Sequence, residues 1–153
     1  MANVLDVAQY ILQERGSMTS MKLQKLIYYC QAWSLVWDEE ALFDEKIEAW
    51  SNGPVVRELF EQHRGQFIVA SIDGGDSDNL TDDQKETIDA VLAYYGDKTA
   101  QWLSDLSHME SPWLAARKGV PDGANCENEI TIASMHEYYC SIPKSEITSY
   151  AQR

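Results

Sequence analysis

Histidine, serine and cysteine are the side chains of this chain that could carry acid–base or nucleophilic chemistry, and their spacing matches no known catalytic pattern. His63, His108 and His136 are far apart, form no HxxxH or HExxH pair and have no cysteine at metal-ligand spacing. His108 is followed closely by Ser111-Pro112-Trp113, which is typical of a fixed turn. A hydrolase that uses His108 with a nearby acid or serine therefore stays an alternative to a structural histidine.

Motifs for nucleotides and for acyl transfer are missing as well. The sequence contains no GxxxxGK[ST] loop, no GxGxxG loop and no GxSxG elbow. We therefore expect no cofactor, no metal and no catalytic residue, and the sequence favours a protein that is not an enzyme.

The net charge of the chain limits the kinds of partner that it is expected to bind. The 153 residues include 12 Lys and Arg against 25 Asp and Glu, which gives a net charge of −13. Direct binding to nucleic acid needs a basic surface, so we do not expect it. An acidic protein instead attracts a partner with a basic face.

Membrane insertion and secretion are also not expected. The longest charge-free stretch of the apolar region, residues 26–37, is too short to cross a bilayer, and the N-terminus has no basic lead. Three cysteines, Cys30, Cys126 and Cys140, are odd in number, which argues against a disulfide framework and favours the cytoplasm.

The apolar periodicity predicts a mainly α, compact single domain of about six to seven helices over residues 1–142, followed by a polar tail at 143–153. A small β or irregular insert is expected near residues 42–50, and Gly53-Pro54 is expected to turn directly into a helix. Helices are predicted at about 4–14, 20–37, 54–64, 82–95, 99–108, 111–117 and 131–140.

The segment 20–37 is the most informative of these helices. Leu23, Leu26 and Ile27 begin one apolar stripe, and Met21 and Tyr28 begin a second stripe on the opposite side. A helix that is apolar on two faces is usually central in its domain. The other interpretation is that the second stripe is partly open and receives a partner.

Residues 73–89 are strongly acidic. Seven acids and a single lysine occupy this range, which predicts a solvated loop leading into a helix that Thr81 and Gln84 cap. A different hypothesis is that the patch imitates nucleic acid, so that the chain is an acidic inhibitor. That hypothesis predicts a strong salt dependence of binding.

Three motifs in order resemble those of a known family. They are residues 21–29 (MKLQKLIYY), residues 49–56 (AWSNGPVV), and His108 with Pro112-Trp113 and Arg117. The chain resembles the Panacea domain of SocA-like antitoxins, also described as phage-associated GepA-type proteins, from about residue 3 to 141. Asn52 departs from the family, in which the position before the glycine is often aromatic.

The resemblance implies an antitoxin of a bacterial or prophage toxin–antitoxin system, which neutralises its cognate protein toxin by direct contact. Toxins paired with this family include translation inhibitors such as alarmone-synthetase-like enzymes. We expect contact from the second helix and the Gly53-Pro54 turn, with further residues lining the same groove, and packing or turn formation is the alternative for each. The candidate toxin-binding residues are Tyr28, Trp50, Val55, Arg57, His108, Trp113 and Arg117.

Overall fold

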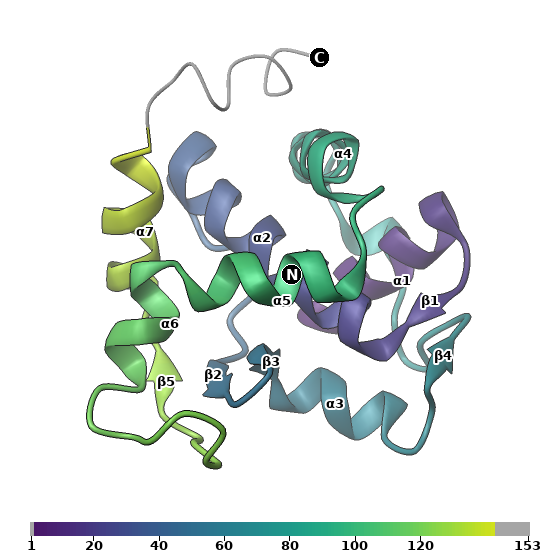
Figure 1. Ribbon diagram of the computed structural model, residues 1–153. Coiled ribbons are helices and arrows are strands. Elements are labelled where there is room, and N and C mark those ends of the chain that lie inside the picture. The colour runs from purple at the N-terminus through teal and green to yellow at the C-terminus, as the bar shows by residue number, and fades with distance from the viewer. Residues whose placement is uncertain (1, 143–153) are drawn as a thin grey trace.

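The protein folds into a mainly α domain with two small antiparallel sheets, as the computed structural model shows for residues 2–142 (Figure 1). This confirms the predicted fold class, while the predicted tail at 143–153 lies outside the described residues. Seven α-helices are present in the described part: α1 (Val4–Arg15), α2 (Ser20–Trp37), α3 (Arg57–His63), α4 (Asp82–Tyr95), α5 (Ala100–His108), α6 (Ser111–Ala116) and α7 (Ile132–Cys140), with a short 3-10 turn, η1 (Ser77–Asn79).

Local capping residues determine where several helices begin. The Asn3 side chain accepts a hydrogen bond from the Asp6 backbone N–H, and the Asp6 carboxylate accepts one from the Asn3 backbone N–H, so α1 starts with a capping box. Thr81 and Gln84 form the same arrangement at the start of α4, as the sequence predicted. Thr19 caps α2 by accepting from the Lys22 amide.

The predicted insert near residues 42–50 forms part of a β-hairpin, and three further strands lie elsewhere in the described chain. β2 (Ile47–Trp50) pairs with β3 (Gly53–Val56) in a hairpin, and β5 (Glu129–Ile130) joins the other edge of β2. A second sheet consists of β1 (Met18–Thr19) and β4 (Ile68–Val69). Neither β5 nor the second sheet was predicted, because two-residue strands carry no periodicity of their own.

The prediction that Pro54 opens a helix is wrong. Pro54 lies in β3, opposite Ala49, and the helix begins three residues later at Arg57. Gly53 has a φ of 125°, which lets the chain reverse into a strand instead of a helix. Because β3 is at the edge of its sheet, the missing N–H of Pro54 costs no ladder hydrogen bond.

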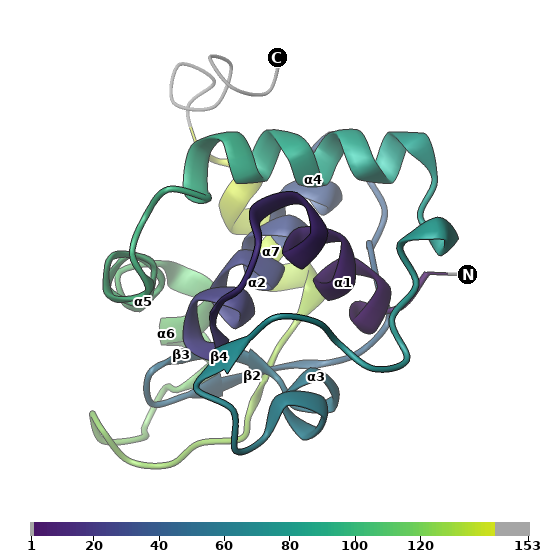
Figure 2. The ribbon, with the colours of Figure 1, turned by 90° about the vertical axis from the view of Figure 1, so that its right-hand side faces the viewer.

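Helix α2 forms the centre of the domain. α4 runs along one side of it and the β2–β3 hairpin with α3 lies on the opposite side, in both ribbon views (Figures 1 and 2). All residues from Leu23 to Leu35 are buried, whereas Met21 at the start of the helix is 38% exposed. The interpretation as a central helix is therefore confirmed, and the second stripe is closed apart from Met21.

A buried polar cluster joins α2 to α6 and α7. Glu110 is 5% exposed and accepts hydrogen bonds from the hydroxyls of Tyr29 (2.6 Å) and Tyr139 (2.7 Å). The Tyr139 hydroxyl also lies 3.0 Å from that of Tyr28, which is 1% exposed. Burial raises the pKa of Glu110 to about 7, although the hydrogen bonds from the two tyrosine hydroxyls act to lower that pKa.

None of the helices in the described residues has both the length and the apolar character that a membrane crossing requires.

Candidate functional site

The β2–β3 hairpin is held from one side by polar side chains of α2. The Gln24 amide oxygen accepts from the Val56 N–H (2.9 Å) and its NH₂ group donates to the Val56 carbonyl (3.2 Å). Gln24 thus acts as one more strand residue at the free edge of β3. Lys25 Nζ donates to the Pro54 carbonyl at 3.2 Å, which fixes the start of the same strand.

Residues of α6 and the turn after it hold the hairpin from the other side. Trp113 Nε1 donates to the Trp50 carbonyl (2.9 Å), and the Arg117 guanidinium donates to the Ala49 carbonyl (3.0 Å). Arg117 also donates to the carbonyls of Pro121 and Ala124, so it fixes the loop that follows α6. His108 stacks on Trp113 with ring centroids 4.1 Å apart. The three sequence motifs therefore converge on one hairpin.

The Trp50 side chain stands on the outer side of this hairpin and is partly exposed. It packs edge-on against Phe60 (centroids 5.0 Å apart), and the Arg57 guanidinium lies 5.4 Å above its ring. Its Nε1 donates to Glu48 (2.8 Å), which also accepts from Arg57 Nε (3.1 Å). Arg57 further pairs with Glu127. The indole is thereby fixed in orientation before any partner arrives.

The charge of Glu48 is stabilised by these donors. Burial alone would raise the pKa of Glu48, but the hydrogen bonds from Arg57 and Trp50 outweigh burial and hold that pKa below its usual value. Glu48 is therefore ionised at neutral pH and keeps Arg57 over the indole.

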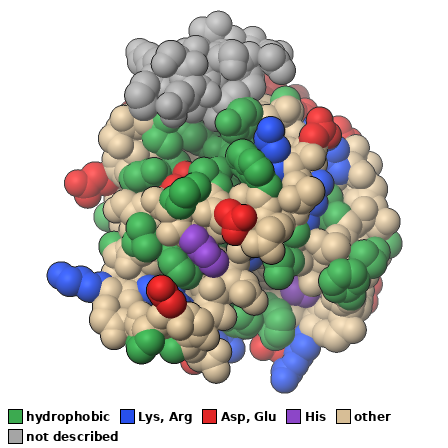
Figure 3. Space-filling view, viewed as in Figure 1, with side chains coloured by type: hydrophobic (Ala, Val, Ile, Leu, Met, Phe, Trp, Pro, Cys, Tyr) green, Lys and Arg blue, Asp and Glu red, His purple; other side chains and the backbone are tan. Residues whose placement is uncertain are grey.

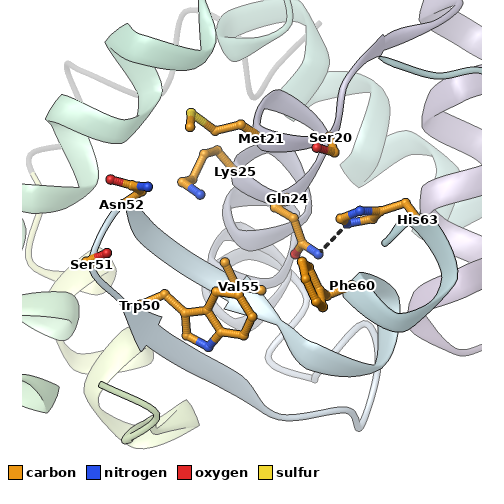
Figure 4. Close-up of a pocket in the computed structure, with 10 residues that line it drawn as sticks. All are labelled: Ser20, Met21, Gln24, Lys25, Trp50, Ser51, Asn52, Val55, Phe60 and His63. Carbon is orange, nitrogen blue, oxygen red and sulfur yellow. Dashed lines mark hydrogen bonds between the residues drawn. The ribbon is translucent and has the colours of Figure 1, made fainter. Parts of the chain in front are cut away.

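Two hollows flank Trp50, which lines both of them together with Ser51. The first, of about 160 Å³, lies between the start of α2, the hairpin and α3 (Figure 4). The second, of about 490 Å³, lies between Arg57 and the loop at residues 125–127. A partly exposed tryptophan between two hollows is the kind of feature on which protein partners anchor.

Lys25 is the charged residue of the first hollow. The residue is 1% exposed, and its amine end points toward the turn that carries Ser51 and Asn52 (Figure 4). Burial lowers the pKa of Lys25 to about 8, so the amine still carries a proton at neutral pH. In the described part of the chain its ammonium makes one hydrogen bond, to the Pro54 carbonyl, and no ion pair.

His63 forms the opposite wall of this hollow. Because the Gln24 oxygen is occupied by the Val56 N–H, its NH₂ group faces His63 Nε2 at 3.0 Å, and that ring nitrogen must accept. Burial lowers the pKa of His63, which agrees with a neutral ring. The wall therefore contributes no second positive charge at neutral pH.

The structure divides the seven candidate binding residues into three groups by exposure. Trp50 and Arg57 are partly exposed beside the hollows, and Val55, although 8% exposed, lines the first one. His108 is partly buried against Trp113. Three others are buried and support the hairpin or the core instead of offering a surface: Tyr28 (1% exposed), Trp113 (6%) and Arg117 (4%).

Gln24 and Lys25 are the residues that sequence reasoning missed, although both lie in the first of the three motifs. A second glutamine of α2 binds backbone groups in the same way as Gln24. Gln31, seven residues after Gln24, binds the Leu42 amide (2.7 Å) and the Phe43 carbonyl (2.9 Å) in the same two-handed way. Residues seven apart lie on the same side of a helix, and each of these two amides binds the backbone of a segment packed against α2.

The surroundings of His108 give little support to the hydrolase alternative. The hydroxyls of Ser104 and Ser107 donate to the carbonyls of Asn52 (2.6 Å) and Ser104 (2.8 Å), so neither is bonded to His108. Within the described residues, His108 Nε2 has no hydrogen-bond partner, and no group of His, Cys, Asp and Glu is arranged to hold a metal. Burial, with a contribution from the Lys25 charge, lowers the pKa of His108.

Comparison with known proteins assigns the chain by sequence. Residues 23–114 match the family described as "Antitoxin SocA-like, Panacea domain", which is more than half of the 153 residues. The match begins within α2 and ends at Leu114 of α6, so it includes the hairpin, most of the lining of the first hollow, half of the lining of the second, and Trp113. No curated protein and no solved structure gave a match.

Proposed function

The chain belongs to the SocA-like antitoxin family with the Panacea domain, and from this we propose that it neutralises one cognate protein toxin by binding it directly through the surface around Trp50. The observation that carries the proposal is the position of Trp50. It is a partly exposed, pre-oriented indole between two hollows, on the hairpin that all three family-like motifs support.

Apolar side chains near the first hollow support the same surface. Met21 lines the hollow and is 38% exposed, while Phe67 and Ile68 are 76% and 52% exposed. The Phe67 carbonyl accepts from the Ser20 amide (2.9 Å), so these residues lie beside the start of α2. Figure 3 shows apolar side chains gathered over β4, where Ile68 belongs. Exposed apolar groups of this kind favour a protein partner.

The charge of the chain supports a basic toxin. A net charge of −13 attracts a positively charged partner over distances beyond direct contact and accelerates encounter. Toxins that stop translation by acting on RNA or nucleotides need positive surfaces, so we propose a translation inhibitor as the target. The three cysteines are free, which fits an encounter in the reducing cytoplasm.

Co-expression tests this proposal. The chain should restore growth to cells that express the toxin encoded beside its gene, and Trp50→Ala should abolish the rescue and weaken the complex in a pull-down. Trp102→Ala is the matched control, because Trp102 is 39% exposed on α5 and lines neither hollow. Failure to rescue growth from any toxin encoded next to the gene would remove the basis of the proposal.

An acidic inhibitor that imitates nucleic acid is the second candidate, because the acids of residues 73–89 are all exposed. Under that hypothesis, replacing the neighbouring pair Asp82 and Asp83 by Asn should weaken toxin binding more than Trp50→Ala does. The affinity should also fall steeply with salt. The direct-contact proposal predicts the opposite order of the two variants.

A further inference from the structure

The Lys25 ammonium is a buried positive charge without a negative partner among the described residues. Burying an ammonium is costly unless hydrogen bonds or an opposite charge compensate it. Here it has a single acceptor, the Pro54 carbonyl, for three donor protons. In a chain with 25 acidic residues, none of the described residues that line the first hollow is acidic.

We propose that this hollow receives the side-chain carboxylate of an Asp or Glu of the toxin, which forms an ion pair with Lys25. This inference rests on the proposed function and adds the chemistry by which the toxin is recognised. Lys25 is then a binding residue, and the Gly53-Pro54 turn is its support.

The size and lining of the hollow fit one side chain of a protein. About 160 Å³ is less than the 300–1,000 Å³ typical of small-molecule sites, and the hollow shares Trp50 and Ser51 of its lining with the second one. Phe60 and Val55 offer apolar walls for methylene groups, while Ser51 and Asn52 offer donors at the turn. A segment of the toxin that crosses the indole would place one acidic side chain against Lys25.

An ion pair between Lys25 and a toxin carboxylate makes toxin binding by this acidic chain specific. The net charge of −13 repels acidic surfaces in general, so only a carboxylate aligned with Lys25 gains a compensating ion pair. A toxin that presents an apolar or basic side chain here would leave the ammonium buried and uncompensated. The pair therefore determines the register of the complex, while the wider field provides the attraction.

The first experiment uses the chain alone, with acetate as the probe. The indole N–H resonance of Trp50, which lines the hollow, should shift and saturate with acetate but not with acetamide, which has the same shape without the charge. The response should disappear in Lys25→Met. Equal responses to acetate and acetamide, or an unchanged acetate response in Lys25→Met, would overturn the proposal. An equal response to inorganic phosphate would also count against a site built for carboxylates.

The second experiment uses the complex with the toxin that the chain neutralises. Lys25→Met should weaken binding by roughly thirtyfold or more, as expected when one partner of a buried pair is removed. Lys22→Met, one turn earlier on α2 and outside the hollow, should leave the affinity unchanged. Replacing each Asp and Glu of the toxin by its amide should identify one residue whose loss is not additive with Lys25→Met.

The toxin scan keeps the test decisive even if Lys25→Met folds poorly, because it leaves this chain unchanged. If no acidic side chain of the toxin matters, or if only its terminal carboxylate does, the proposal is wrong. If Trp50→Ala abolishes binding while Lys25→Met does not, the antitoxin function stands and the carboxylate site falls. If no toxin binds at all, the proposed function fails, and the acetate titration still decides what the hollow accepts.

Discussion

Trp113 donates its indole N–H to the backbone carbonyl of Trp50 at 2.9 Å, which ties α6 to the hairpin across 63 residues of sequence. The two tryptophans therefore have different tasks. Trp113 is 6% exposed and supports the strand, whereas Trp50 is partly exposed and faces outward. Composition alone gives no means of separating them, since buried anchors and binding anchors share the same chemistry.

Trp113→Phe tests the supporting role. Phenylalanine keeps an aromatic ring against His108 but removes the donor to Trp50, so we expect a loss of about 1–2 kcal/mol in the free energy of unfolding. Toxin binding should weaken as well, because the hairpin that presents Trp50 is less firmly held. Urea denaturation and a pull-down measure the two effects. Trp102→Phe, with its indole on the surface of α5, should change neither.

The helices were predictable because each is encoded by nearby residues. The cap of α4 is Thr81 with Gln84 three positions later, and the bounds of α2 follow from its apolar stripes. The β2–β3 hairpin was only partly predictable, because its edge is satisfied by Gln24, about 30 residues earlier. Pro54 was misplaced for the same reason: its local preference suits a helix start, and tertiary hydrogen bonds at Pro54 and Val56 decide for a strand.

The candidate site was predictable in its location but not in its division of tasks. The three motifs that suggested Tyr28, Trp50 and Arg117 do converge on one region, yet only burial separates a residue that holds the hairpin from one that faces a partner. Lys25 was the hardest to assign. A lysine on an acidic chain is expected to pair with a nearby acid, and only the packed structure shows that no described acid lines its hollow.

Gly53→Ala should damage both the hairpin and the site. Gly53 has a φ of 125°, and an added Cβ would overlap Lys25 Cε and lie 3.2 Å from Ser107 Oγ. We expect a loss of about 1–3 kcal/mol in the free energy of unfolding from backbone strain alone, together with displacement of the Lys25 amine. Thermal denaturation and the acetate titration measure the two effects.

Gly65→Ala is the matched control for that substitution. Gly65 also has a positive φ, of 85°, but an added Cβ there meets nothing within 4 Å. It should therefore cost stability through strain and leave the acetate response of Trp50 unchanged. If both variants keep that response, Gly53 does not support the position of Lys25.

Lys25→Met should stabilise the free chain at neutral pH, although it removes one hydrogen bond. Burial lowers the pKa of Lys25 from 10.5 to about 8, so the folded state binds fewer protons than the unfolded state between these two values. The wild type therefore gains stability as pH rises from about 8 to 10.5, by an amount on the order of 3 kcal/mol. The free energy of unfolding of Lys25→Met should not rise in this way, so the variant is more stable than the wild type below pH 8.

The measurement is the free energy of unfolding of the two proteins across this alkaline range. A difference between them that does not depend on pH would mean that Lys25 titrates normally in the folded state. Lys22→Met serves as the control, because it removes an equal charge from the same helix outside the hollow. A buried charge that lowers the stability of the free protein is expected at a site where binding requires that charge.

Glu110→Gln should change the pH dependence of stability on the acid side of neutrality. Burial raises the pKa of Glu110 from 4.5 to about 7, so between these values the folded state holds a proton that unfolding releases. Stability contributed by this group is thus complete below about pH 4.5 and is lost as pH rises toward 7, by up to about 3 kcal/mol. The amide cannot ionise, and its oxygen still accepts from Tyr29 and Tyr139.

The quantity to compare is the difference in the free energy of unfolding between the variant and the wild type, measured from pH 4.5 to pH 7. The variant should gain on the wild type as pH rises, because only the wild type must place a charge among the buried tyrosines. Glu61→Gln is the control, because it removes an equal charge from a side chain that is 50% exposed. A flat difference for Glu110→Gln would show that this carboxyl ionises without cost, which requires water or a cation to reach the core between α2 and α7.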